Sequence, residues 1–268
     1  MGPRRGGWLG GLAIVYGAVI TLFTIAPFIV VFLASVTSAE YLQFPPRGLS
    51  LRWYAAVWHR PEVLAALGNS LVAAVATVIL TTVLNVPAAY ALSRYRFRGR
   101  QFLLAFLMSP LMLPGIVIGF AIVRFYGAIG FPLSLAGLVL AHAVVTLPYG
   151  LRTIAASMFG FDRTLEEAAV TLGAHPVRAF LSVTLPIIKP GLIAGAVFVF
   201  ITSFDNVTVS LFLVSPRFTV LPMWLFSYVE QSADPIAAAI ASAITVASLI
   251  VVVLLDRFVG LRGRMYVG

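Results

Sequence analysis

The chain has 268 residues, of which 61% are hydrophobic and only 10% are charged. Soluble domains carry about 25% charged residues, so this composition excludes an ordinary soluble enzyme and indicates an all-α integral membrane protein. The chain contains no cysteine, which excludes disulfides, thiolate metal sites and a cysteine nucleophile. The formal net charge of +9 could suggest a nucleic-acid partner, but its distribution along the chain argues against one.

Long apolar runs predict six membrane-spanning helices in one transmembrane domain that covers residues 1–268. The first run is longer than the hydrophobic region of a cleaved signal peptide, so we expect an uncleaved first span. The predicted spans lie at about residues 8–35, 67–93, 102–126, 135–159, 191–214 and 236–259.

Proline and glycine residues mark special positions inside two of these spans. Pro110, Pro114 and Gly115 interrupt the third span and predict a kink or a break there. Small residues four apart allow a neighbouring helix to approach closely. Such pairs occur at Gly115 with Gly119 and at Gly191 with Gly195.

The connections between the spans carry aromatic and basic residues. Residues 37–65 are rich in aromatic residues, which gather at the membrane–water boundary, and residues 49–58 are expected to form a short helix there. Residues 94–100 alternate arginine with aromatic side chains. Such a run could stack on nucleic acid, but a short basic loop between two spans is typical of a topology determinant. Residues 215–235 form a second polar connection.

The basic residues predict the orientation of the chain. With six spans, both termini, the 94–100 loop and residues 160–190 lie on the same side of the membrane. The positive-inside rule makes that side cytoplasmic. The opposite side receives Arg47, Arg52, Arg60, Arg124 and Arg217. The cytoplasmic side collects 13 of the 18 basic residues: Arg4, Arg5, Arg94, Arg96, Arg98, Arg100, Arg152, Arg163, Arg178, Lys189, Arg257, Arg262 and Arg264.

Residues 164–186 are the one long stretch that reads as a water-facing helical element. Thr164 and Glu167 have the spacing of a capping box, which predicts a helix start. Gly173 is placed to end that helix in a left-handed conformation. Pro176 is placed as the first residue of a second short helix that runs to about residue 185.

The first of these helices carries an apolar stripe on one face. A short, alanine-rich amphipathic helix suits insertion into a groove on a partner protein. The alternative is a helix that rests on lipid headgroups, but such helices usually carry Lys or Arg on the polar face, and here Glu166 and Glu167 stand there. The stripe consists of Leu165, Ala168, Ala169 and Leu172.

The same stretch resembles the EAA loop, E-A-A-x3-G-x9-I-x-L-P, of the membrane subunits of binding-protein-dependent ABC importers. The match comprises Glu167-Ala168-Ala169, Gly173 and Val183-x-Leu185-Pro186, with valine where isoleucine is usual. The resemblance implies the type I importer permease fold, with a cytoplasmic coupling helix that docks on an ABC ATPase. The residues expected to couple to the ATPase are Glu166, Glu167, Ala168, Ala169, Leu172 and Gly173.

The resemblance also implies an assembly. It would contain two copies of a cytoplasmic ATPase that binds ATP and Mg, a second homologous permease subunit and an extracytoplasmic substrate-binding protein, in a bacterial inner membrane. Further segments resemble the subfamily that carries spermidine and putrescine, although permeases for amino acids, phosphonates or iron share much of the pattern. These segments are Asn69-Ser70-Leu71, Ala88-Ala89-Tyr90-Ala91-Leu92-Ser93-Arg94, Ser203-Phe204-Asp205-Asn206 and Asp234-Pro235.

Asp205 is the one acidic residue predicted near the middle of a span. A carboxylate at mid-bilayer is costly, so it should face protein or water. On a continuous helix, Thr202, Asp205, Asn206 and Val209 would share one face, with Ser203 beside them. This patch could line a translocation pathway that attracts an amine cation, or it could be a hydrogen-bonded contact between helices.

A second polar group precedes the sixth span. Tyr228, Glu230 and Asp234 could form an acidic, aromatic entrance suited to amines, or they could belong to an ordinary solvated loop.

Several kinds of chemistry are missing from the sequence. No P-loop is present, so the chain does not hydrolyse ATP by that route. The three histidines are scattered without metal-ligand spacing, and no serine nucleophile elbow occurs. A translocation subunit without its own catalytic or metal site fits best. A secondary transporter is the alternative, and it would predict inverted repeats and discontinuous helices with several buried ionisable residues.

Overall fold

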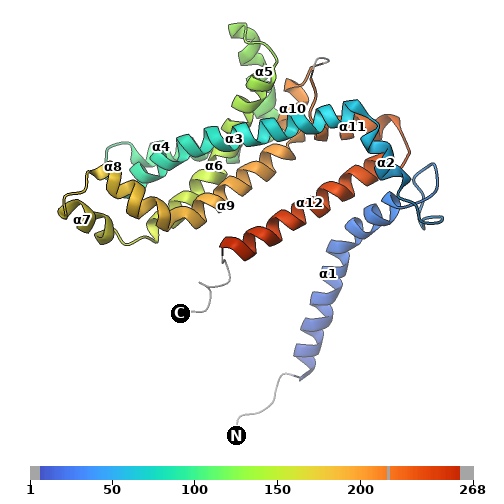
Figure 1. The fold of residues 1–268 in the computed structure, drawn as a ribbon, viewed down its shortest axis with the longest axis horizontal. Coiled ribbons are helices and arrows are strands. Elements are labelled where there is room, and N and C mark those ends of the chain that lie inside the picture. Colours follow the sequence, from blue (N-terminus) through green and yellow to red (C-terminus); the bar gives the residue numbers. More distant parts are fainter. Residues whose placement is uncertain (1–6, 216–217, 260–268) are drawn as a thin grey trace. The chain divides into compact units, whose positions relative to one another are not determined.

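The computed structural model describes residues 7–215 and 218–259. These residues fold into helices joined by short connections, and within them only two isolated β-bridges occur. The chain divides into two compact units, Met1–Leu64 with Ser227–Gly268, and Ala65–Phe226 (Figure 1). We call them unit 1 and unit 2. That residues 1–268 form a single domain stays a prediction.

Unit 1 contains α1 (Gly7–Ser35), α2 (Arg52–Trp58) and α12 (Ile236–Val259). The α2 helix confirms the short helix predicted within residues 49–58. The Tyr54 hydroxyl of α2 forms hydrogen bonds of 2.7 Å with the hydroxyls of Ser35 and Ser242. A tyrosine therefore joins all three helices, since Ser35 ends α1 and Ser242 belongs to α12.

Unit 2 is built on α3 (Pro61–Arg94), α6 (Leu135–Phe159) and α9 (Leu185–Phe204), which lie alongside one another in Figure 1. Their contact is apolar and includes Leu92 of α3, Leu151 of α6 and Ile188 of α9. Gly191 and Gly195 of α9 face Ser157 and Thr153 of α6 so closely that a side chain would collide with them. The small-residue pair predicted in the fifth span is therefore a helix contact.

The predicted third span is broken. The α4 helix (Arg100–Met108) and a 3-10 turn (Ser109–Met112) are followed by α5 (Gly115–Ile129), with a bend of 105° between the two parts. Proline has no N–H to continue the hydrogen-bond ladder, and Pro114 takes the position before the first residue of α5. The break predicted from Pro110 and Pro114 is thus confirmed.

The α5 helix packs on α10 (Val207–Leu213) through its glycines. A side chain on Gly115 would meet the Thr208 hydroxyl at 2.9 Å, and one on Gly119 would meet the Phe212 ring at 2.7 Å. The predicted close approach at this pair is confirmed.

The second half of the 164–186 stretch differs from the prediction. The α8 helix (Pro176–Ala179) begins at Pro176 as predicted, but it does not stop near residue 185. It passes through a π-helical turn (Phe180–Thr184) directly into α9, so that Pro176–Phe204 forms one long apolar helix. Pro186 cannot donate a backbone hydrogen bond, and Leu185 N–H bonds instead to the Phe180 carbonyl five residues back.

Two further features were not anticipated. The fifth predicted span is interrupted, because α9 ends at Phe204 and α10 begins after Asn206. The Asn206 side chain accepts a hydrogen bond of 2.9 Å from the Val209 N–H and so caps a new helix. The 215–235 connection contains a helix, α11 (Leu221–Gln231), that was not predicted.

The described residues bear on the number of spans. Within 7–215 and 218–259, four helices are long and apolar enough to cross a membrane, and the bent α4–α5 pair would add a fifth. Ile236–Ile250 of α12 is a shorter apolar stretch. The six-span topology stays a prediction. Arg4, Arg5, Arg217, Arg262 and Arg264, which entered the charge argument, lie outside the described residues.

Candidate functional site

The helix predicted to dock on a partner is α7 (Thr164–Thr171). Its start is not the predicted capping box, because Thr164 already lies inside the helix and Arg163 takes the cap position without a side-chain bond. Asp162 accepts a 3.0 Å hydrogen bond from the Thr164 N–H, which lowers the pKa of Asp162. Glu167 instead forms an exposed ion pair of 2.8 Å with Arg163.

The end of α7 agrees with the prediction. Gly173 has a φ of +94°, in the left-handed region, and open space surrounds the position of its missing side chain. The Gly173 N–H bonds to the Val170 carbonyl, and the Ala174 N–H bonds to the Ala169 carbonyl. These two bonds form a Schellman motif, which requires a left-handed residue at its centre. His175 then caps α8 through a bond from the Val177 N–H to its Nδ1.

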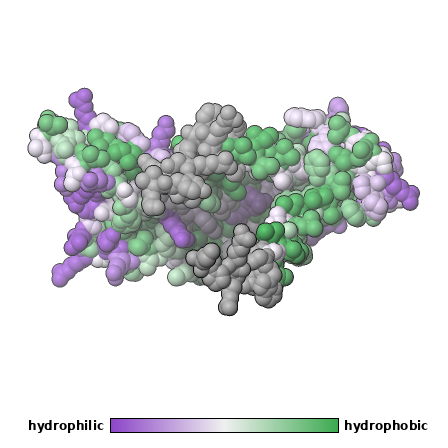
Figure 2. Space-filling view, turned by 90° about the horizontal axis from the view of Figure 1, so that it is seen from below, coloured by the Kyte–Doolittle hydropathy of each residue, from purple (hydrophilic) through white to green (hydrophobic). Residues whose placement is uncertain are grey.

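The predicted apolar stripe of α7 is uncovered in this chain. Leu172 is 89% exposed and Leu165 is 50% exposed, Ala168 is exposed, and Ala169 is half-buried. Hydrophilic side chains gather around this end of unit 2 in Figure 2. Exposed arginines follow α3 at positions 96 and 98 and flank α7 at positions 163 and 178. The α7 helix thus presents a small apolar face within a polar surface.

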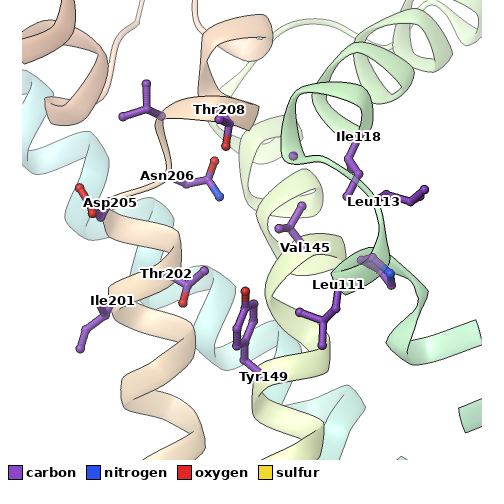
Figure 3. Close-up of a pocket in the computed structure, with 13 residues that line it drawn as sticks. Leu111, Leu113, Ile118, Val145, Tyr149, Ile201, Thr202, Asp205, Asn206 and Thr208 are labelled. Atoms are coloured by element: carbon purple, nitrogen blue, oxygen red, sulfur yellow. The ribbon is translucent and has the colours of Figure 1, made fainter. Parts of the chain in front are cut away.

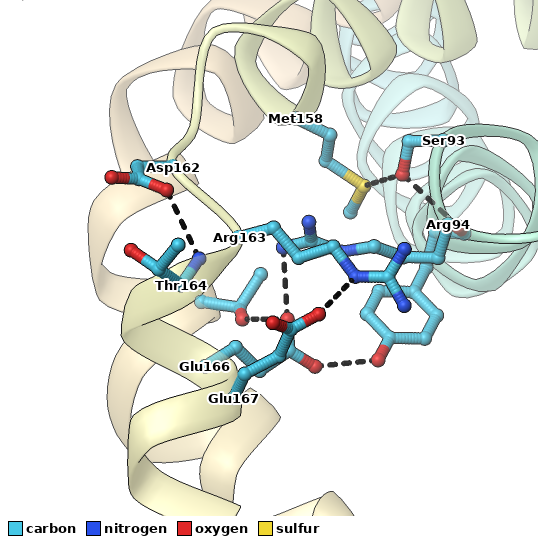
Figure 4. A network of polar contacts seen from close by, with 10 residues as sticks. Ser93, Arg94, Met158, Asp162, Arg163, Thr164, Glu166 and Glu167 are labelled. Atoms are coloured by element: carbon cyan, nitrogen blue, oxygen red, sulfur yellow. Dashed lines mark hydrogen bonds and ion pairs between the residues drawn. The ribbon is translucent and has the colours of Figure 1, made fainter.

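Glu166 behaves differently from the prediction. It was expected to contact a partner protein, but it is the one buried residue of α7. Its Oε2 accepts hydrogen bonds of 2.8 Å from Arg94 Nη2 and Thr184 Oγ1, and its Oε1 accepts one of 2.5 Å from the Tyr90 hydroxyl (Figure 4). We call Glu166, Arg94, Tyr90 and Thr184 the Glu166 cluster.

The electrostatics of the Glu166 cluster favour the ionised carboxylate. Burial by itself raises the pKa of Glu166, but the hydrogen bonds from Tyr90 and Thr184 and the charge of Arg94 outweigh it, so the pKa is lowered. The side chains of Arg94 and Glu166 are only 7% and 10% exposed. Sequence reasoning missed the cluster because Arg94 and Glu166 are 72 positions apart, and no local pattern pairs them.

A pocket of about 520 Å³ lies where the two broken helices of unit 2 meet. Its walls include Leu111 and Leu113 beside the α4–α5 break, and Asp205 and Asn206 at the α9–α10 break (Figure 3). Tyr149 of α6 also lines the pocket. Neither of the two ion pairs among the described residues involves Asp205, and no hydrogen bond reaches its exposed carboxylate.

The predicted pathway residues of the fifth span are only partly brought together. Thr202, Asp205 and Asn206 line the pocket, although the break means that they do not share one helical face with Val209, which is buried elsewhere. Ser203 points away from the pocket. Its hydroxyl is 2.9 Å from Nδ1 of His142, a residue to which the sequence assigned no role.

His142 completes a buried polar contact between three helices. Its Nε2 lies 3.1 Å from the Ser210 hydroxyl of α10, while Nδ1 faces Ser203 of α9. A buried polar side chain needs such partners, and here they hold both halves of the broken span against α6. Ser203 therefore serves helix packing in this structure.

The second predicted group lies in unit 1 and is described by itself. The Tyr228 hydroxyl donates a 2.5 Å hydrogen bond to Asp234, and burial followed by this bond raises the pKa of Tyr228. Asp234 also accepts a bond from the Ile236 N–H at the start of α12. Arg60 lies over the Tyr228 ring at 5.2 Å, and Glu230 is exposed. Asp234 is thus engaged in starting a helix.

Comparisons with known proteins agree with the EAA resemblance. The family described as "Binding-protein-dependent transport system inner membrane component" matches residues 85–262. The spermidine/putrescine transport system permease protein PotC of Escherichia coli K12 is 32% identical over 207 residues, which cover 77% of this chain and 78% of PotC. The putrescine transport system permease protein PotI of the same strain is 32% identical over 229 residues, covering 83% of this chain and 81% of PotI.

A solved structure shows the same fold. A chain of a bacterial ABC transporter involved in the import of the acidic polysaccharide alginate superimposes with a TM-score of 0.78 at 18% identity, covering 96% of this chain and 99% of that chain. The discontinuous helices that were expected of a secondary transporter therefore occur here in an ABC permease. On the strength of the family match and of these relatives, the chain belongs to the inner-membrane components of binding-protein-dependent transport systems, as a multi-pass translocation subunit without catalytic activity of its own.

Proposed function

We propose that this permease subunit couples import to ATP hydrolysis by docking α7 into a groove on a cytoplasmic ABC ATPase. One observation carries the proposal: the chain leaves the apolar face of α7 uncovered, with Leu172 89% exposed. An amphipathic helix with an open apolar face and a fixed end suits a groove on another protein. Glu167, the exposed acidic residue at its start, favours a protein partner over a lipid surface.

The family membership supports a proposal for the remaining parts of the assembly. A binding-protein-dependent system needs an extracytoplasmic protein that delivers the solute, and ATP with Mg would bind to the ATPase. We infer a complex with two ATPase copies and a second homologous permease. The excess of basic residues on one side supports cytoplasmic termini and a cytoplasmic α7.

For the solute we propose a polyamine or a related amine. The relatives PotC and PotI are named for spermidine and putrescine. The pocket at the two helix breaks is lined by Asp205, whose carboxylate is exposed, and by Tyr149 and Thr202, which carry hydroxyls. A carboxylate without a protein partner attracts an ammonium group, and hydroxyls can accept its hydrogen bonds.

Copurification tests the docking of α7. The tagged chain is coexpressed with a candidate ABC ATPase from the same genome, and the Leu172→Asp variant is compared with Leu49→Asp, which changes a leucine of unit 1 that is 79% exposed. We expect the parent and Leu49→Asp to retain the ATPase and Leu172→Asp to lose it, because a buried unpaired charge opposes docking. Equal retention by all three would refute docking through this face.

Uptake by cells that express the complete importer tests the solute. We expect saturable, ATP-dependent uptake of labelled spermidine or putrescine, with competition from the other amine. Uptake of only an amino acid, a phosphonate or iron would be consistent with an importer and would refute an amine as its solute.

A further inference from the structure

The way in which α7 is held to the rest of unit 2 is unusual for a helix with an apolar stripe. Leu165 of α7 and Leu172, which directly follows the helix, are exposed, and the one buried residue of α7 is Glu166. The ion pair with Arg163 is exposed and lies next to α7 in the sequence, so it does not connect α7 to a distant element. A directed polar contact thus replaces the apolar packing that usually seats a helix.

The three donors to Glu166 come from α3, which is distant from α7 in the sequence, and from the π-helical turn before α9. Tyr90 and Arg94 lie in the last two turns of α3, and Thr184 ends the π-helical turn that leads into α9. Each donor lies 2.5–2.8 Å from a carboxylate oxygen. Charge-assisted hydrogen bonds of this length are the stronger, directional kind.

Aromatic rings hold the Arg94 side chain in place. Its guanidinium lies 4.9 Å from the Phe161 ring and 5.9 Å from the Tyr90 ring, and the Tyr90 ring packs edge-on against Phe180 at 5.2 Å. Arg94 therefore has little freedom to follow Glu166 independently of α3. A displacement of α7 must either carry α3 and the π-helical turn with it or break the cluster.

We propose that Glu166 is the positioning residue that joins α7 to α3 and α9, so that movement of α7 is passed through this carboxylate to α3, to which no short backbone segment connects α7. The inference rests on the proposed docking of α7 on an ATPase. It assigns different roles to the two adjacent glutamates of α7, of which only Glu167 belongs to the EAA motif. Glu167 lies on the exposed surface of α7, whereas Glu166 faces inward and transmits.

Distances between spin labels on the chain alone, without any partner protein, test whether Glu166 holds α7 to α3. The chain has no cysteine, so Val83→Cys on α3 and Thr171→Cys on α7, both exposed, would be the only labelled sites. We expect one sharp α3–α7 distance in the parent and loss of that sharp peak in Glu166→Gln. Tyr90→Phe, which removes one of the three donors, should broaden the peak less. Glu62→Gln removes an exposed glutamate at the other end of α3 and should leave it sharp.

The same labels in the complex with the ATPase test transmission. We expect addition of ATP to leave the α3–α7 distance unchanged in the parent and to shift it in Glu166→Gln, where α7 would move without α3. A sharp, ATP-independent distance in Glu166→Gln would overturn the proposal, as would an ATP-dependent shift in the parent. If the parent chain retained no ATPase, the proposed docking of α7 would be refuted. The measurement on the chain alone would still test whether Glu166 joins α7 to α3.

Discussion

Two carboxylates of unit 2, Glu166 and Asp205, occupy opposite situations. Glu166 is buried and accepts hydrogen bonds from three side chains, including a buried arginine. Asp205 is exposed in a pocket and receives no hydrogen bond or ion pair from the described residues. The comparison teaches that a carboxylate satisfied by its own chain serves the fold, whereas one left open at a break between helices has no such task, and we propose that it meets a ligand cation.

Their positions in the helices reinforce the difference. Glu166 lies inside α7 and ties that helix to two others, so its removal should destabilise α7 and the ends of the helices that contact it. Asp205 follows the last residue of α9, where the helix ladder already ends and Asn206 caps the next helix. Little of the fold depends on the Asp205 side chain.

The largest expected effect is on the free energy of unfolding, which should change much more on substitution of Glu166 than on substitution of Asp205. Glu166→Gln should destabilise the purified chain by about 3 kcal/mol, because it leaves the buried Arg94 charge unpaired. Asp205→Asn, the same chemical change, should stay within about 0.5 kcal/mol of the parent. Thermal unfolding in detergent measures both. Equal midpoints of thermal unfolding for the two variants would show that Glu166 matters no more to the fold than Asp205 does.

A smaller effect concerns the end of the helix that Glu166 anchors. Gly173→Ala should destabilise the turn after α7 by about 1–2 kcal/mol, since alanine resists the left-handed conformation although space is open around it. The matched control is Gly127→Ala, also in open space but inside α5, where alanine favours the helix. Import by the assembled complex should fall in the Gly173→Ala variant and not in the Gly127→Ala variant.

Two harsher substitutions at α7, Gly173→Asp and Glu167→Lys, should abolish import while the chain stays inserted in the membrane.

Some of this architecture could be predicted from local chemistry. Pro110 and Pro114 forecast the break in the third span, and Gly173 and Pro176 forecast the turn between α7 and α8, because the backbone restrictions of these residues act wherever they occur. The glycine pairs predicted two close helix contacts because glycine has no side chain to hold a neighbouring helix away. Each of these signals depends on a few neighbouring residues.

The remaining features depend on residues far apart in the chain. The stripe of α7 suggested that its leucines bind something and that both glutamates face outward, but Arg94 on another helix turns Glu166 inward. The break at Asp205 contains neither proline nor glycine, and it arises where the Asn206 side chain competes for a backbone N–H. His142 gained its role only when two serines of a broken span met it.

Uptake kinetics test whether the Asp205 carboxylate attracts the amine. Asp205→Asn should raise the half-saturating concentration of spermidine or putrescine on the order of tenfold, or about 1.4 kcal/mol, because the carboxylate no longer attracts the ammonium group. A neutral solute carried by the same importer should be unaffected. Unchanged amine uptake would assign Asp205 to packing. Glu62→Gln, which removes an exposed carboxylate far along α3, controls for the general loss of negative charge.

The smallest expected effect is a dependence of stability on pH that belongs to Glu166. Its pKa in the folded chain is lowered from the ordinary value of 4.5, so its contribution is present above that value and is lost as the pH falls further towards the folded-state pKa. Thermal midpoints in detergent should therefore decline below a pH of about 4.5 in the parent, and more shallowly in Glu166→Gln. Asp162 also has a lowered pKa, so Asp162→Asn is the necessary control. A decline that disappeared in Asp162→Asn and persisted in Glu166→Gln would show that the buried cluster is not the group that titrates.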